Sequence, residues 1–151
     1  MKPSLLSRFT LVLLYLCLLV GFAFLGLLPK FLPLILLTSD LQPDPSIEYA
    51  LSLACWMLGS LGGLFILFTL IRMMKSLRED PFVLRNVHHL RNMGCTALGM
   101  TVLTLIAAML YFRPLLPVIA MAELLCALFS LVLCSVFKKA VEYREENALT
   151  I

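Results

Sequence analysis

The composition of this chain is that of a membrane protein. The chain has 151 residues, of which 62% are hydrophobic and only 14% are charged, and its formal net charge is +3. A soluble domain is usually about 45–50% apolar and about 25% charged. Because this chain lacks the charged side chains that would cover a water-soluble globule, its composition excludes that class and predicts an integral membrane protein.

Four apolar blocks follow one another along the chain, and each is bounded by charges or prolines. A helix needs about 20 residues, rising about 1.5 Å each, to cross a hydrocarbon core of roughly 30 Å. We therefore expect transmembrane helices at about residues 9–28, 49–71, 92–112 and 115–137. Lipid cannot satisfy backbone polar groups, and the blocks lack the alternation of barrel strands. The predicted fold is an all-α membrane protein, with four transmembrane helices in a compact bundle.

The first block differs from a cleaved signal peptide. Gly21-Phe22-Ala23 offers a small-x-small pattern, but the hydrophobic run continues to Leu28. It is therefore longer than the roughly 7–15 apolar residues of a signal peptide. We expect this block to be retained as the first transmembrane helix.

The distribution of Lys and Arg predicts the orientation. Ten of the twelve basic residues precede the first block, separate the second from the third, or follow the fourth: Lys2, Arg8, Arg72, Lys75, Arg78, Arg85, Arg91, Lys138, Lys139 and Arg144. The other two are Lys30 and Arg113. The positive-inside rule then places both termini in the cytoplasm, with an outer loop at 29–48, a cytoplasmic loop at 72–91 and a cytoplasmic tail at 138–151. The positive charge thus reflects topology, and we expect no direct nucleic-acid binding.

The outer loop and the cysteines indicate no metal site and no disulfide framework. Phe31 to Leu37 is apolar but too short to cross a membrane, so we expect it at the interface or against the helix ends. Asp40 and Asp44 lack a third fixed oxygen ligand, so a solvated loop is expected there. All five cysteines lie within the apolar blocks, where we expect buried free thiols that pack between helices. No cofactor is predicted.

Small residues at a four-residue spacing predict tight helix packing. Such spacing clears one face of a helix and lets another backbone approach. The third block carries two such pairs, Cys95–Gly99 and Ala97–Thr101. In the fourth block, small residues recur at every fourth position from Ala122 to Cys134. The packing residues predicted in this way are Gly59, Gly63, Gly99, Ala122, Cys126 and Ser130. Packing within the chain is expected, with homodimerisation as the alternative.

Glu123 is the ionisable residue that lies well inside an apolar block. It follows Pro117 by six residues, hence roughly 9 Å below the outer end of its helix. A carboxylate inside a membrane suggests an ion or proton pathway, or a counter-ion for a ligand. The alternative is a protonated Glu123 that bonds to a hydroxyl or a carbonyl, and Arg113 is a further candidate partner.

The loop between the second and third blocks predicts a short amphipathic helix. Asp80 suits an N-cap and Pro81 a first helical position. Val83, Val87 and Leu90 then recur at helical spacing. Such a basic segment is expected to rest on anionic headgroups or to dock a cytosolic partner. Metal binding by the neighbouring His88 and His89 is disfavoured, because adjacent helical positions point about 100° apart.

Two cytosolic motifs resemble one known family. Glu79-Asp80-Pro81-Phe82, followed by Asn86-Val87 and Leu90-Arg91, is similar to the loop of the YoaS-like bacterial membrane proteins, domain-of-unknown-function family 2975. The C-terminal residues 144–151 resemble that family's ending, with Ala148 where Asp is usual. The resemblance implies a four-helix protein of the bacterial inner membrane without an established activity. It also implies a helix-turn-helix regulator as a candidate partner.

Three functional hypotheses follow. The preferred one is a non-enzymatic membrane protein that binds or senses through its cytosolic loop and tail, and that tethers a transcription regulator. A small transporter or transporter accessory subunit using Glu123 is the second, and an enzyme acting on lipid is disfavoured because no catalytic constellation is present. The candidate recognition residues are Asp80, Pro81, Phe82, Asn86, Arg91, Glu146, Asn147, Leu149 and Ile151.

Overall fold

Four long helices make up almost all of the structure. The computed structural model describes residues 5–36, 45–79, 83–111 and 115–149. The helices are α1 (Leu5–Leu36), α2 (Pro45–Glu79), α3 (Leu84–Tyr111) and α4 (Leu115–Leu149). Each is long and apolar enough to cross a bilayer. The all-α fold with four membrane-spanning helices is thereby confirmed.

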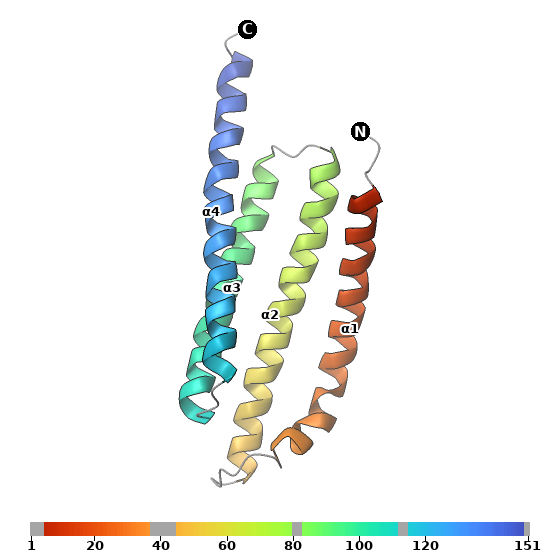
Figure 1. Cartoon of the computed structure of the whole chain (residues 1–151), viewed down its shortest axis with the longest axis vertical. Helices are drawn as coiled ribbons and strands as arrows, with labels where there is room; N and C mark the ends of the chain where they lie inside the picture. The colour runs from red at the N-terminus through yellow and green to blue at the C-terminus, as the bar shows by residue number, and fades with distance from the viewer. Residues whose placement is uncertain (1–4, 37–44, 80–82, 112–114, 150–151) are drawn as a thin grey trace.

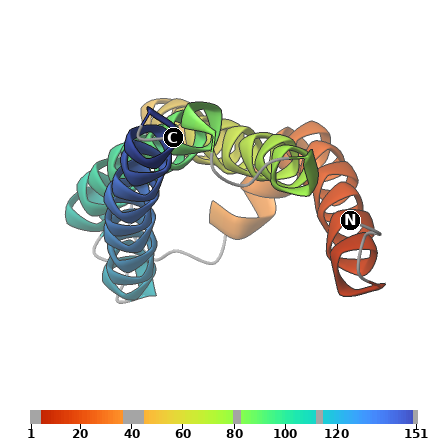
Figure 2. The ribbon, with the colours of Figure 1, turned by 90° about the horizontal axis from the view of Figure 1, so that it is seen from above.

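The helices stand in an open, curved row rather than in a closed bundle (Figures 1 and 2). Each helix packs against its neighbours in sequence, and no Cα atom of α1 lies within 8 Å of a Cα atom of α4 among the residues that the structure describes. The compact bundle expected from the sequence is therefore replaced by an arc. In lipid, the outward apolar faces need no protein cover, so burial of apolar surface supplies no force that closes the ring.

The interface between α3 and α4 is the most extensive of the three. At Gly94 of α3 the two helices approach closely, since an added Cβ would lie 2.7 Å from Leu131 Cδ2 and 3.3 Å from the carbonyl oxygen of Ala127. Two side chains of α4 also donate to backbone carbonyls of α3. Ser130 Oγ lies 2.9 Å from the Leu90 oxygen, and Cys134 Sγ lies 3.3 Å from the Val87 oxygen. These contacts tie the first half of α3 to the middle of α4.

The other two interfaces each have a close approach at a glycine. Gly62 of α2 faces Met100 of α3, where an added Cβ would lie 2.8 Å from the methionine sulfur. Gly21 of α1 faces Leu64 of α2, with a corresponding distance of 2.8 Å to Cδ2. Each of these glycines therefore lets its helix approach a large side chain of the next helix.

The end of α1 is bent by two prolines. Proline lacks the N–H that bonds to the carbonyl four residues earlier, so Pro33 leaves the Pro29 carbonyl without its helical donor. The Tyr49 hydroxyl of α2 donates to that oxygen at 3.3 Å. Beyond Pro29 the helix turns toward the concave side of the row (Figure 2), and Leu32 is almost fully buried there. The expected outer loop is therefore shorter than 29–48, because 29–36 belongs to α1 and 45–48 to α2.

The expected amphipathic segment is the beginning of α3 itself. Val83 precedes the helix, and Val87 and Leu90 are buried where α3 meets α4. Because α4 covers Val87 and Leu90, these two side chains are not free to insert into the membrane surface. Contact of the basic side of this segment with headgroups stays a prediction. Asp80, Pro81 and Phe82 lie outside the described residues.

Apolar side chains cover most of the outer surface. Large hydrophobic residues on all four helices are more than half exposed, among them Phe22, Leu58, Val102 and Phe129. A monomeric water-soluble protein rarely exposes such an area, so this surface suits contact with lipid. The five cysteines are free, and three of them, Cys17, Cys95 and Cys126, are exposed rather than buried between helices as expected.

Candidate functional site

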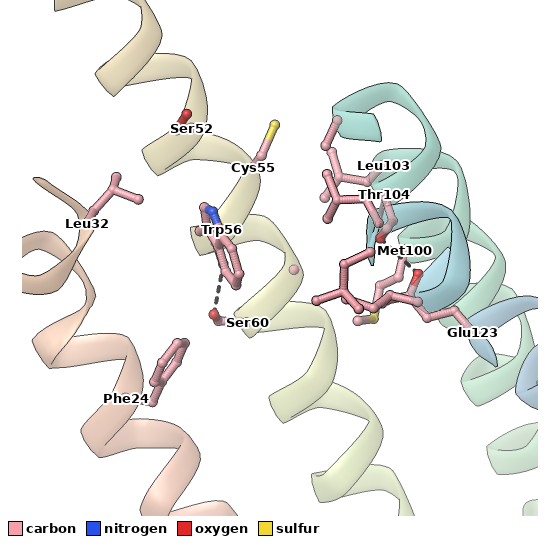
Figure 3. A pocket seen from close by; sticks show the side chains of 15 residues that line it. Phe24, Leu32, Ser52, Cys55, Trp56, Ser60, Met100, Leu103, Thr104 and Glu123 are labelled. Atoms are coloured by element: carbon pink, nitrogen blue, oxygen red, sulfur yellow. Dashed lines mark hydrogen bonds between the residues drawn. The ribbon is translucent and has the colours of Figure 1, made fainter. Parts of the chain in front are cut away.

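A cavity lies among the four helices, near the end of the molecule that faces away from both chain termini (Figures 1 and 3). Its volume is about 460 Å³, within the range of sites that hold small organic molecules. Its walls are formed by Phe24 of α1, Trp56 of α2, Leu103 of α3 and Ile119 of α4, together with Glu123. The cavity therefore depends on how all four helices are arranged.

Glu123 is held at the cavity by a hydrogen bond from α3. Thr104 Oγ1 donates to Glu123 Oε2 at 2.9 Å (Figure 3). Both side chains line the cavity. Thr104 is thus a hydroxyl partner of the kind that the sequence analysis named as one alternative for Glu123. Arg113, the other candidate partner, lies outside the described residues.

The hydrogen bond from Thr104 satisfies Glu123 only in part. An ionised carboxylate has two oxygens with about four acceptor positions. Among the described residues, Thr104 is the donor to Glu123. A charged side chain at the centre of a membrane helix costs roughly 2.5–3.5 kcal/mol on insertion scales. Glu123 therefore has acceptor positions left that a donor or a cation in the cavity would satisfy.

Three further residues that line the cavity, Thr104, Trp56 and Gly59, could have been proposed from their positions in the sequence. Because α4 follows α3 closely along the chain, residues equally far from the connection between them lie at similar depth. Thr104 precedes the end of α3 by seven residues and Glu123 follows the start of α4 by eight, roughly 10 and 12 Å along the two helices. Trp56 and Gly59 lie at i and i+3 on one face, where a large side chain borders a small one.

The predicted glycine contacts are absent from the described structure. Nothing lies within 4 Å of a Cβ added at Gly59, Gly63 or Gly99. The close approaches occur at other glycines, each of which meets a large side chain of the next helix. Spacing along one helix identifies a cleared face, but it does not say which neighbour occupies that face. The prediction of packing at these three glycines is therefore wrong for contacts within the chain.

The predicted small-residue stripe on α4 is only partly correct. Ser130 is buried and bonded to α3, whereas Ala122 and Cys126 are exposed. The buried small residues are instead Ala120 and Ala127. At about 100° per residue, a four-residue step advances about 40° each time and leaves the interface, while a seven-residue step drifts only about 20°. The packing face therefore follows a seven-residue spacing.

The candidate cytosolic residues that the structure describes differ in burial and in their place along the helices. Asn86 is fully buried, whereas Arg91, Glu146 and Asn147 are exposed. Arg91 lies beside the residue bonded to Ser130, and 16 residues of α4 separate Ser130 from Glu146, which is about 24 Å of helix. Arg91 is therefore far from Glu146. The Leu149 side chain and Ile151 lie outside the described residues.

Comparison with known families gives one match over nearly the whole chain. Residues 6–151 match the family described as Protein of unknown function (DUF2975). The chain belongs to this family. The resemblance drawn from the cytosolic loop and the C-terminal residues is confirmed at the level of the domain family. No curated protein and no solved structure matches this DUF2975 chain.

Proposed function

We propose that this protein is a non-enzymatic protein of the bacterial inner membrane, with both termini in the cytoplasm. In this proposal it binds or senses a partner through its cytosolic loop and tail. The family resemblance suggests a helix-turn-helix transcription regulator as that partner. The protein would then hold the regulator at the membrane.

The end of α4 is the observation that carries this proposal. Beyond the buried Val141, every residue from Glu142 to Asn147 is exposed, and α4 extends past the end of α2 and the start of α3 (Figure 1). We call residues 142–149 the α4 arm. Its charges have both signs, and Lys138 lies 3.7 Å from Glu142 at the base of the arm. Such a mixed-charge helix suits water and a protein partner better than hydrocarbon.

Site-specific crosslinking tests this proposal. A photoreactive amino acid replaces Tyr143, which is 65% exposed on the arm, in the full chain in intact cells. We expect a crosslink to a soluble DNA-binding protein. Deleting residues 147–151 should lower the yield by about tenfold or more, because about 1.4 kcal/mol of lost contact already weakens binding tenfold.

The same photoreactive group at Phe129 is the matched control. Phe129 is 67% exposed on the apolar part of the same helix, so it should crosslink to lipid or membrane proteins and to no soluble partner. Failure to recover a soluble protein from position 143 would contradict the proposal. An equal yield with and without the last residues would do so as well.

The second candidate function is a small transporter or transporter accessory subunit that uses Glu123. The hydrogen bond between Thr104 and Glu123 at an intramembrane cavity favours it. The crosslinking experiment separates the two candidates. Recovery of an ATPase or permease subunit, in place of a DNA-binding protein, would support the second.

A further inference from the structure

The cavity around Glu123 combines apolar walls with one acidic group. Phe24, Leu103 and Ile119 contribute hydrocarbon, and Glu123 contributes a carboxylate bonded to Thr104. None of the described residues that line the cavity is Lys, Arg or His. A ligand that matches these walls is apolar, and a ligand that matches the ionised carboxylate is positively charged.

We propose that this cavity binds a lipophilic cation, meaning an apolar molecule that carries one amine or onium group. The cationic group would lie against Glu123 and the apolar body against the walls of α1, α3 and α4. This inference deepens the second candidate function, because both rest on Glu123, and it is independent of any cytosolic partner.

The position of the cavity favours a ligand that arrives through the bilayer. Phe24, Trp56 and Ile119 line the cavity and are each at least 40% exposed. Since the surrounding surface is apolar, the cavity opens toward hydrocarbon rather than toward water. The indole of Trp56 adds a second favourable contact, because aromatic faces attract cations. Its position at the rim suits the passage of a cation toward Glu123.

Two sources could supply such a cation. One is a free lipophilic amine or onium compound dissolved in the membrane. The other is a membrane lipid with an ammonium headgroup. Both would place a cationic group against Glu123. If the source is a membrane lipid, a change in bilayer composition alone changes the occupancy of the cavity. If the source is a free compound, it does not.

Fluorescence of Trp56 tests the proposal directly, because Trp56 is the single tryptophan of the chain and lines the cavity. The purified full chain in phosphatidylglycerol nanodiscs is titrated with tetraphenylphosphonium and, separately, with tetraphenylborate, which has the same shape and the opposite charge. We expect a saturable change in Trp56 emission with the cation and none with the anion. Nanodiscs that contain phosphatidylethanolamine should weaken apparent cation binding if that lipid competes, and should leave it unchanged if the source is a free compound.

Two pairs of variants complete the design. Glu123→Gln removes the negative charge and should weaken cation binding by about tenfold or more, whereas Glu142→Gln on the arm should not change it. Gly59→Leu fills the cavity, because Gly59 lines it and has no atom within 4 Å of an added Cβ. This variant should also abolish binding. Gly63→Leu, at an equally open glycine of the same helix that does not line the cavity, should bind normally.

Equal responses to the cation and the anion would overturn the proposal, since the cavity would then be an ordinary lipid-filled groove. Unchanged binding by both Glu123→Gln and Gly59→Leu would overturn it as well. Neither result would bear on the α4 arm, because the crosslinking experiment measures a different surface.

Discussion

The role of each glycine in this chain depends on what lies opposite it. Gly94 stands against Leu131 and a backbone oxygen of α4, whereas Gly99 faces open space on the same helix. Gly94 therefore sets the distance between α3 and α4. At Gly99 the missing side chain only lowers helix propensity.

This difference predicts opposite effects of one substitution. Gly94→Ala should lower the free energy of unfolding by about 1–3 kcal/mol, because the added methyl group overpacks the interface. Gly99→Ala should leave stability unchanged or raise it by up to about 1 kcal/mol through helix propensity. Thermal unfolding of both variants in the same detergent checks this. Equal destabilisation would show that Gly99 also lies in a contact, for instance with a second copy of the chain.

Single residues of the cavity were predictable to different degrees. Glu123 could be identified from the sequence because a carboxylate within an apolar block is rare and costly. Thr104 could not be identified by its residue type, since threonine is ordinary in membrane helices. Its distance from the connection between α3 and α4 shows only that it lies at a depth similar to that of Glu123. Its role follows from the pairing of α3 with α4, which brings its hydroxyl to 2.9 Å from Glu123.

At the scale of elements, α1 shows how a proline shapes a contact between two helices. Pro33 frees the Pro29 carbonyl, and Tyr49 of α2 donates to it. The same carbonyl would be occupied within α1 if residue 33 had an N–H. The hydrogen bond from Tyr49 thus depends on a residue that takes no part in it.

A double-mutant cycle tests this dependence. In the native chain, Tyr49→Phe should cost about 0.5–1.5 kcal/mol of stability, the usual contribution of a hydrogen bond. In a Pro33→Ala background the same change should cost clearly less, because the N–H of residue 33 then bonds to Pro29. Unfolding in detergent measures both values. Equal costs in the two backgrounds would show that Pro33 does not control this hydrogen bond.

At the scale of the whole molecule, the termini lie at one end and the cavity lies near the other (Figure 1). The exposed basic residues Arg8, Arg72 and Lys139 come from the end with the termini, and Lys30 comes from the opposite end. The positive-inside rule assigns the end with the termini to the cytoplasm. The cavity would then belong to the outer half of the membrane.

Labelling from outside the cell tests this orientation. In a chain whose five cysteines are replaced, single cysteines are introduced at Lys30 and at Tyr143, both of which are exposed. A membrane-impermeant maleimide should label position 30 in intact cells and position 143 only after the membrane is opened. The reverse pattern would invert the topology and place the α4 arm outside.

The class of this protein, the existence and approximate places of its four helices, and one intramembrane acidic residue could all be predicted from the amino-acid sequence. These features follow from local physics: the length of an apolar run, the cost of an unpaired backbone group in lipid, and the cost of a buried charge. Each of these quantities depends on one segment of the chain alone, so it can be evaluated without knowing how the helices pack.

Which helix faces meet could not be predicted from the sequence and became visible in the arrangement of the helices. The tertiary structure showed that Gly21, Gly62 and Gly94 make close approaches while Gly59, Gly63 and Gly99 do not, and that the helices form an arc with a cavity beside Glu123. In a membrane, the hydrophobic effect does not distinguish a helix face that contacts protein from one that contacts lipid. The choice depends on close packing and single hydrogen bonds between particular side chains, and these exist only once the helices are side by side.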